Sequence, residues 1–472
     1  MKYRRLTRPV RDSPGVSSIL LLGIAVRVGF WKTYLPIWKN HAAFNVLNGE
    51  LVAYIGDFVG YVPGRLPFYD VVAAGFYVVS NGILGIRSLS FSTLVLSCLS
   101  IPLFFAAISR FYDRKVALFS TVLYAFYPKF VVFSAIGMPD AAALSFLAFT
   151  LYAIARAERH DRTAWYAVAG IFALAAYLVQ ISAVLFAMLL TCYVYLDDLQ
   201  EFTGEIEDLV PSVRVWAVAG PSGIAGVLFL VFGPSLQEIS ALSGPNFLFT
   251  TRTYSVVERT IRYVFHVHVD FWWHLQAWDT AHGLWVFVDL FQGFFGDLFP
   301  VYAGGWLFVT GILTSLILVG IASLVSSRDS RISLFVLAWI AIYVALFNFR
   351  NLGWSGSFRT YHVFPLFPAV AIAFGLGATT VADRIREHRT AANLDPLRFP
   401  EIGNADSMVL VAVMVLLLGF LLNAGVHGLI RTENEQAFKV EPIDAVAENV
   451  EPGETVAVFD HSRDLLQRGH VH

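Results

Sequence analysis

The chain has 472 residues, of which 57% are hydrophobic and only 14% are charged, and its mean hydropathy is +0.64. Soluble domains contain about a quarter charged residues, so this composition excludes a set of ordinary soluble domains and indicates many membrane-spanning helices. The formal net charge of -2 excludes a broad basic surface for nucleic acid. Cys98 and Cys192 lie in apolar runs, so the sequence indicates neither a disulfide framework nor a cysteine metal motif.

Apolar runs follow one another along the chain, and a spanning helix needs about 20 such residues. The basic segment 1–15 precedes a run that continues into Phe30 and Trp31 without a signal-peptide cleavage pattern, which predicts a retained first span. The sequence thus predicts an all-α polytopic membrane protein with about eleven transmembrane helices. The predicted spans cover residues 16–38, 88–109, 116–135, 141–157, 164–179, 181–196, 214–233, 301–325, 331–348, 361–381 and 408–430.

Arginine and lysine are concentrated in every second connection between spans, including 110–115 and 384–398. The longer connections on the other side contain fewer of them, and Lys129 is counted with this second group. By the positive-inside rule this distribution predicts a protein of the cell membrane with a cytoplasmic N-terminus and an external C-terminus. The predicted organisation is a cytoplasmic tail (1–15), a transmembrane domain (16–430) with large external loops at about 39–87 and 234–300, and a short external tail (431–472).

Asp140 lies between two predicted spans, directly after Pro139 and before a run of alanines. One interpretation is that its carboxylate caps the helix that follows. The other is that it lies at the mouth of a cavity, where a carboxylate can take part in chemistry.

Three charged residues in the predicted external loops also have both a structural and a functional interpretation. Asp57, among glycine and aromatic residues, is either a base or a turn residue. Arg65, two residues before Pro67, either binds a phosphate with its planar guanidinium or anchors at the lipid headgroups. Arg359, in a segment rich in glycine and serine, either binds phosphate or anchors the interface.

The loop 234–300 contains histidines and aspartates interleaved with tryptophans. Their spacing matches no sharp zinc signature, so an aromatic belt at the membrane interface is favoured over a metal site. The residues are His266, His268, Asp270, Trp272, Trp273, His274, Trp278, Asp279, His282 and Trp285.

Several short motifs, taken in their order along the chain, resemble the GT-C class of integral-membrane glycosyltransferases that use polyprenyl-phosphate sugars. The sequence is similar in this respect to protein O-mannosyltransferases and aminoarabinose transferases, over residues 16–200 and part of 350–380. The motifs are Arg65-Leu66-Pro67-Phe68-Tyr69, the turn Phe111 to Leu118, Tyr127-Pro128, Phe133-Ser134, Gly137-Met138-Pro139-Asp140, Phe358-Arg359-Thr360-Tyr361 and Phe364 to Ala369.

The resemblance implies transfer of a sugar from a polyprenyl-phosphate (dolichyl-phosphate) donor to an acceptor glycan, lipid or protein at the external membrane face. It implies membrane lipids as further partners. No nucleic-acid partner is expected, because the chain has no excess of basic residues. Asp57 and Asp140 are expected to serve as base and as acceptor or sugar positioner, in either order. Reaction with one carboxylate and one displacement inverts the anomeric centre. The residues expected to bind substrate are Arg65, Tyr69, Arg359, Tyr361 and His41.

One departure leaves alternatives open. The family places an acidic pair just after the first span, as base or metal ligand, but Pro36 to His41 contains no carboxylate. Its role could pass to Asp57, His41 or Asp140, with or without a divalent metal, or the fold has lost catalysis. The alternative function is that of a lipid-linked glycan flippase or a polymerase-like membrane protein. A flippase should place charges opposite one another at mid-depth, whereas only Arg27 lies well inside a predicted span.

Overall fold

The computed structural model describes residues 14–33, 87–180, 183–200, 210–224, 303–327, 330–353, 364–391 and 408–419, with single positions at 72, 76, 79, 80, 83, 406 and 421. The chain divides into two compact units, Met1–Leu421 and Leu422–His472, and all of the described residues belong to the first. The predicted loop 234–300, the predicted tail 431–472 and most of the predicted loop 39–87 lie outside the described residues.

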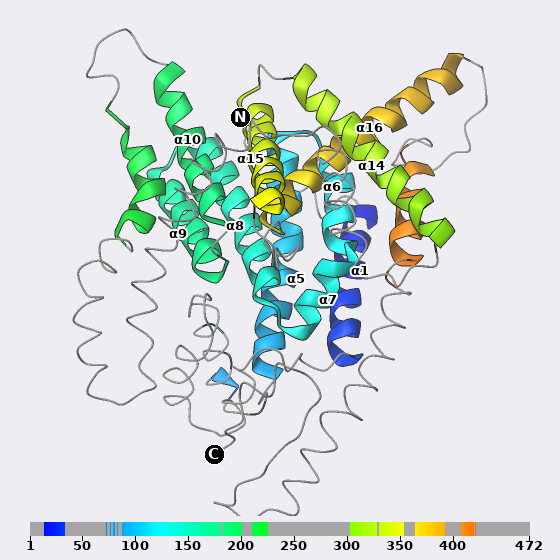
Figure 1. The fold of residues 1–472 in the computed structure, drawn as a ribbon, viewed down its shortest axis with the longest axis horizontal. Coiled ribbons are helices and arrows are strands. Elements are labelled where there is room, and N and C mark those ends of the chain that lie inside the picture. Colours follow the sequence, from blue (N-terminus) through cyan, green and yellow to red (C-terminus); the bar gives the residue numbers. More distant parts are fainter. Residues whose placement is uncertain are drawn as a thin grey trace, which may run out of the picture. The chain divides into compact units, whose positions relative to one another are not determined.

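The regular elements among the described residues are all helices (Figure 1). They are α1 (Pro14–Thr33), α5 (Arg87–Phe111), α6 (Arg114–Phe126), α7 (Pro128–Ile136), α8 (Pro139–His160), α9 (Thr163–Val179), α10 (Val184–Gln200), α14 (Ala303–Ser326), α15 (Arg331–Gly353) and α16 (Phe367–Ala391). Two more helices cover residues 213–224 and Met408–Gly419.

Each predicted span overlaps at least one of these helices, and span 116–135 overlaps two, which confirms the all-α membrane fold class. Ser90–Phe111, Pro139–His160 and Phe364–His388 are long and apolar enough to cross a membrane, and the bent pair α6–α7 would add a fourth span. The other apolar helices in the described residues are shorter, so the count of eleven spans stays a prediction.

Helix α8 lies between α5 and α9 and is buried along most of its length (Figure 1). Its contact surfaces are rich in small residues: Ala142, Ala148, Ala153 and Ala157 are fully buried. Lipid tails are as apolar as leucine, so helices in a membrane associate through close packing of this kind. The alanine-rich sequence of α8 therefore explains its central position.

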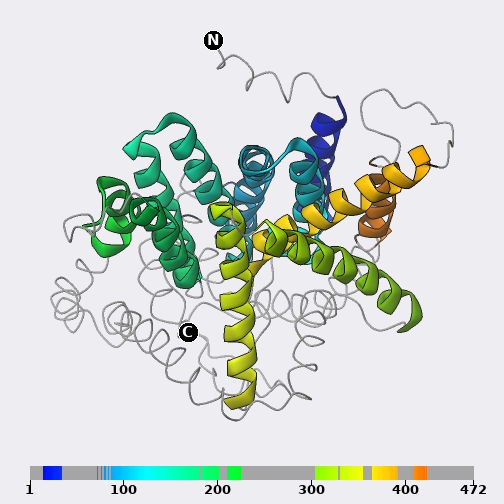
Figure 2. The same ribbon diagram turned by 90° about the horizontal axis from the view of Figure 1, so that it is seen from above.

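Helix α14 crosses α16 (Figures 1 and 2), and glycines at the contact allow their backbones to touch. A Cβ atom at Gly320 would overlap the backbone of Ala373, and one at Gly377 would overlap the backbone of Leu316. On another side of α16, Gly375 faces Ser120 of α6 in the same way. These glycines join α14, α16 and α6 into one packed group.

Helices α6 and α7 meet at a bend of 50° and together are long and apolar enough to form one broken span. Tyr127 has an extended backbone (φ -63°, ψ 115°), and Pro128 has no N–H group to donate to the Tyr124 carbonyl one turn earlier. Arg27 of α1, which is fully buried, donates hydrogen bonds to the carbonyls of Gly23, Ala125 and Tyr124. The guanidinium thus caps the C-terminal end of α6, where carbonyl groups and the helix dipole favour a cation.

Candidate functional site

The connection from α7 to α8 positions the one predicted catalytic residue that the structure describes. Gly137 ends α7 with φ 79°, a left-handed conformation that glycine adopts without strain, and its N–H donates to the Phe133 carbonyl. Pro139 then opens α8 at a position where its missing N–H costs nothing. Asp140 follows in the first turn and is only 4% exposed.

The interpretation of Asp140 as a helix cap is wrong. The N-cap of α8 is Met138, which makes no side-chain capping bond. Asp140 instead lies two residues after the N-cap, in the first turn of the helix, and its Oδ1 accepts a hydrogen bond of 3.0 Å from Nε2 of Gln180. A carboxylate in the first turn also interacts favourably with the helix dipole. Its burial and its contact with a second helix are consistent with the alternative, a carboxylate held in place for chemistry.

Gln180 is a site residue that the sequence analysis did not identify. It follows the last residue of α9, and its backbone N–H donates to the Ala176 carbonyl. Helices α8 and α9 pack together and are joined by a tight turn, so the end of α9 lies beside the start of α8. In the sequence, Gln180 is visible only as a polar residue between two apolar runs. This is a weak indication of a functional residue, because many membrane proteins contain such interruptions.

Lys129 is the second unexpected residue. The count of basic residues assigned it to an external connection although it falls in the predicted span 116–135, and the structure places it in the first turn of α7 with 4% exposure, so the external assignment is wrong. Its Nζ lies 5.7 Å from the centroid of the Phe364 ring, and the Phe364 ring lies 5.1 Å from that of Phe133. The ammonium of Lys129 thus lies near an aromatic pair that joins α7 to the segment before α16.

The described part of the motif Phe364 to Ala369 packs against the bent span. The Phe367 ring stacks on that of Tyr127 at 4.3 Å. Two segments separated by more than half of the chain, each carrying a motif of the same family resemblance, therefore lie side by side next to α7. The predicted site residues outside the described residues are His41, Asp57, Arg65, Tyr69, Arg359 and Tyr361.

Polar contacts also join α1, α5 and α7. The indole N–H of Trp31 donates to Ser90 Oγ at 3.0 Å, and the guanidinium of Arg87 lies 5.4 Å from the Trp31 ring centroid. The Thr93 hydroxyl donates to the Ser134 carbonyl at 2.9 Å. We call the region formed by these contacts, Lys129, Asp140 and Gln180 the Asp140 end.

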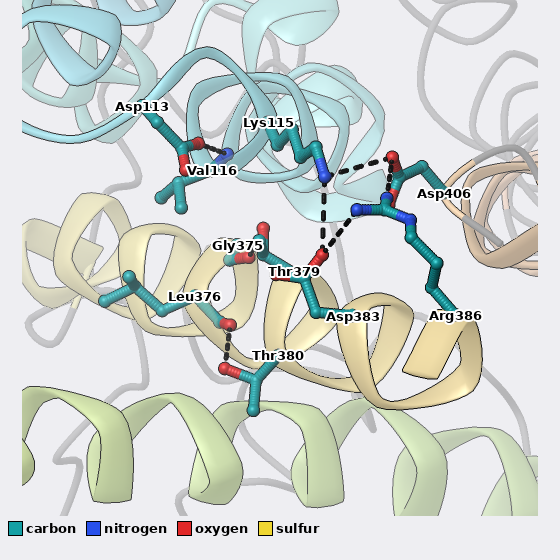
Figure 3. Close-up of polar contacts among 10 residues, drawn as sticks. All are labelled: Asp113, Lys115, Val116, Gly375, Leu376, Thr379, Thr380, Asp383, Arg386 and Asp406. Atoms are coloured by element: carbon teal, nitrogen blue, oxygen red, sulfur yellow. Dashed lines mark hydrogen bonds and ion pairs between the residues drawn. The ribbon is translucent and has the colours of Figure 1, made fainter. Parts of the chain in front are cut away.

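The opposite ends of these helices carry ion pairs, and Figure 3 shows one group of them. Lys115 at the start of α6 lies 3.3 Å from Asp383 of α16 and 3.3 Å from Asp406. Arg386 contacts the same two carboxylates at 3.2 and 2.6 Å. This four-residue group joins α6, α16 and the segment before Met408–Gly419.

The turn before α6 explains how Lys115 is positioned. Asp113 is the N-cap of α6, and its Oδ1 accepts a 2.8 Å hydrogen bond from the Val116 N–H (Figure 3). Tyr112, in the same turn, is partly buried, and this desolvation raises its pKa to about 12.

A second group centres on Arg331 at the start of α15. Its guanidinium pairs with Glu158 of α8 at 2.6 Å, pairs with Asp197 of α10, and lies 4.4 Å from the ring centroid of Tyr193. The Tyr193 hydroxyl also contacts Glu158. We call this group, together with the Lys115 group and the pair Asp161–Arg214 at 2.7 Å, the Asp113 end. Its turns are those predicted to face the cytoplasm, an orientation that stays a prediction.

Among the residues that the structure describes, no group of three or more His, Cys, Asp or Glu side chains is arranged to hold a metal ion. The histidines and aspartates between His266 and His282 lie outside these residues, as does His41.

Residues 66–205, which contain Asp140, Gln180 and Lys129, match the family of dolichyl-phosphate-mannose-protein mannosyltransferases. The comparison with curated protein sequences finds no match.

Solved structures share the fold at low sequence identity. ArnT from Cupriavidus metallidurans in the apo state has a TM-score of 0.57 and 16% identity, with 96% of this chain and 85% of ArnT covered. Its complex with undecaprenyl phosphate has a TM-score of 0.55 and 14% identity, with 96% and 84% covered.

The apo oligosaccharyltransferase of Archaeoglobus fulgidus has a TM-score of 0.53 and 14% identity, with 88% of this chain covered. The chain covers 56% of that larger protein. The resemblance that the motifs indicated is therefore confirmed: the chain has the membrane fold of the GT-C glycosyltransferases ArnT and oligosaccharyltransferase, and its residues 66–205 match the protein mannosyltransferase family.

Proposed function

We propose that the protein transfers a sugar from a polyprenyl-phosphate donor to an acceptor glycan, lipid or protein at the external membrane face, with inversion. The observation that carries this proposal is the position of Asp140, buried at the start of α8 and bonded to Gln180. It lies within the stretch that matches the mannosyltransferase family. The binding of undecaprenyl phosphate by ArnT, which shares the fold, supports the proposed class of donor.

The chemistry requires a base and an electrostatic partner for the leaving group. A carboxylate takes the proton of the acceptor hydroxyl as its oxygen attacks the anomeric carbon. The bond from that carbon to the phosphate oxygen breaks, and the lipid phosphate leaves with the electron pair. Arg65 and Arg359 are the proposed guanidinium groups that stabilise its charge.

The two proposed catalytic carboxylates are Asp57 and Asp140, one as base and the other as positioner of sugar or acceptor. Tyr69, Tyr361 and His41 are proposed to contact the substrates. A single displacement of this kind inverts the anomeric configuration, whereas retention needs a second carboxylate as nucleophile.

The rival function, a lipid-linked glycan flippase, receives less support from the structure. Such a protein needs charged groups available along a path through the membrane. Arg27, the charge that the sequence placed inside a span, donates to three backbone carbonyls at the bend between α6 and α7. Its role in helix capping accounts for its presence without a transport path.

The proposal is tested by an assay in membranes with a labelled polyprenyl-phosphate sugar, comparing the wild type with Asp57→Asn, Asp140→Asn and Arg359→Ala. Loss of a general base lowers the rate by about 100- to 10,000-fold, so at least one aspartate variant should lose transfer to this extent. Asp161→Asn is the control, because Asp161 lies at the Asp113 end with a side chain 73% exposed.

Equal transfer by the wild type and the three variants would rule out the assigned residues. Movement of lipid-linked glycan between leaflets, without transfer of label, would favour the flippase.

A further inference from the structure

A group of basic side chains lies where α8 turns into α9, beside the ion pairs of the Asp113 end. On a helix surface, residues three and four positions apart are neighbours, and the last turns of α8 carry basic residues at this spacing. The turn adds one more arginine, which is the N-cap of α9. We call this group the Arg156 patch, and its members are Arg156, Arg159, His160 and Arg162.

The carboxylates nearest to the patch in the sequence have cations of their own. Glu158 pairs with Arg331 at 2.6 Å, and Asp161 pairs with Arg214 at 2.7 Å. Within the described part of the chain, no carboxylate forms an ion pair with an arginine of the patch. Three guanidinium groups therefore lie close together at the surface beside an exposed histidine, with no described counter-ion.

The helix dipoles account for only part of this arrangement. Arg159 and His160 lie in the last turn of α8, where the negative end of the dipole favours a cation. Arg162 lies at the start of α9, where the positive end of the dipole disfavours one. Arg156 comes nearly one turn before Arg159, and its Nε is buried without a hydrogen-bond partner. Stabilisation of the end of α8 therefore does not explain the whole patch.

The patch borders a surface suited to lipid. The guanidinium of Arg156 lies 5.3 Å from the centroid of the Trp165 ring, which meets the ring of Tyr152 edge-on at 6.3 Å. Tryptophan and tyrosine are enriched at the level of the lipid headgroups. Further along the apolar helix α9, Ile171 is 54% exposed. The patch thus lies at the end of the candidate span Pro139–His160, with an exposed apolar side chain next to it on α9.

We propose that the Arg156 patch binds the headgroup of an anionic phospholipid, whose phosphate contacts the arginines while its acyl chains lie against α9. The planar guanidinium presents N–H donors that match the geometry of a phosphate, and basic side chains at a membrane surface attract anionic lipids. A free phosphate has the same charge but no acyl chains to cover α9. This inference does not depend on sugar transfer, because Asp140 lies roughly 24 Å from Arg156 along the α8 axis.

Binding is measured on the full-length protein in detergent by native mass spectrometry, with phosphatidylglycerol, phosphatidylcholine and inorganic phosphate as separate probes. The wild type should bind phosphatidylglycerol, which has a net negative charge, more tightly than the zwitterionic phosphatidylcholine. Arg159→Gln and Arg162→Gln should each weaken the binding of phosphatidylglycerol about fivefold, and the double variant about 30-fold. Binding of phosphatidylcholine should not change.

The matched control is Arg384→Gln. Arg384 is also an exposed arginine, and it follows Asp383 of the Lys115 group, but it pairs with Glu387 at 3.3 Å. This variant should bind phosphatidylglycerol as the wild type does. If it weakens that binding as much as Arg159→Gln does, any basic residue in this region contributes alike, and the assignment to the patch is wrong.

Thermal unfolding separates lipid binding from a structural role. Arg159→Gln should keep the Tm of the wild type in detergent, because Arg159 makes no ion pair with a described carboxylate. Arg159→Lys should recover most of the binding of phosphatidylglycerol, because the charge is kept. A structural arginine would instead give a lower Tm and weaker binding of both lipids.

Besides equal weakening by the control, four outcomes would overturn the proposal. They are unchanged binding of phosphatidylglycerol by the double variant, the structural pattern just described, binding of inorganic phosphate as tight as that of phosphatidylglycerol, and a wild type that does not prefer phosphatidylglycerol to phosphatidylcholine. The third would assign the patch to a free anion. The fourth is expected if the acidic segment 201–208 of this chain occupies the patch in place of lipid.

Discussion

The two ends of the helices hold their charged residues with different partners. At the Asp113 end, Arg331 and Lys115 each contact two carboxylates, and these ion pairs tie neighbouring helices together. At the Asp140 end, the carboxylate of Asp140 accepts a bond from an amide, and the ammonium of Lys129 lies over a ring.

The difference bears on what each end can do. The ion pairs at the Asp113 end fix neighbouring helices and weaken the field of each charge, whereas the bond from Gln180 orients the Asp140 carboxylate. We therefore expect substitutions at the Asp113 end to change stability and substitutions at the Asp140 end to change transfer.

The largest expected effect on stability comes from Arg27, which lies between the two ends. Arg27→Met would leave the carbonyls of Ala125 and Tyr124, at the end of α6, without this donor inside the membrane domain. Each buried acceptor left unsatisfied costs about 1–3 kcal/mol, so we expect a loss of about 2–4 kcal/mol, seen as a lower Tm in detergent. Arg27→Lys should lose less, because an ammonium can still donate. An unchanged Tm for Arg27→Met would contradict the capping role.

The next effect is expected at the Asp113 end. Arg331→Met removes the shared partner of Glu158 and Asp197, whose side chains are only 20% and 30% exposed. Two half-buried carboxylates without their cation should lower the stability by about 2 kcal/mol, with transfer per folded molecule unchanged. Tm and labelled-sugar transfer on the same preparation check both parts. If Arg331→Met lowers transfer without lowering the Tm, the Asp113 end contributes to transfer as well, contrary to this expectation.

A smaller change is expected at the Asp140 end. Gln180→Leu removes the amide that fixes the Asp140 carboxylate, and we expect about tenfold slower transfer with little change in Tm. Because Gln180 acts through Asp140, the pH profile of transfer should shift in Gln180→Leu, and the substitution should add no further loss to Asp140→Asn. Gln180→Asn, with a shorter amide, is the matched control for the loss of polarity. Additive losses in the double variant would show that Gln180 acts independently of Asp140.

The smallest effect is expected for Lys115→Met. The Lys115 side chain is 40% exposed, and Arg386 still contacts both Asp383 and Asp406 after the substitution. The free energy of unfolding should fall by less than about 1 kcal/mol, and the difference from the wild type should shrink in high salt. If Lys115→Met lowers the Tm as much as Arg331→Met does, the burial of an ion pair does not determine how much it contributes to stability.

Much of the fold could be predicted because membrane helices need long apolar runs. The predicted run 141–157 lies within α8, and the proline-containing run 116–135 contains both α6 and α7. The candidate site was predicted less completely. Asp140 stood out as a carboxylate between apolar runs, but Gln180 and Lys129 did not, because their roles depend on contacts with residues distant in the sequence.

The sequence by itself determined the membrane fold class, the family motifs and the presence of a helix close after Pro139, because hydropathy and backbone chemistry act over neighbouring residues. Only the tertiary structure decided that Arg27 caps α6, that Gln180 binds Asp140 and that Lys129 is buried beside Phe364. The physical reason is that a side chain's partner is set by which helix faces pack together, and apolar runs specify that a helix is buried without specifying its neighbour.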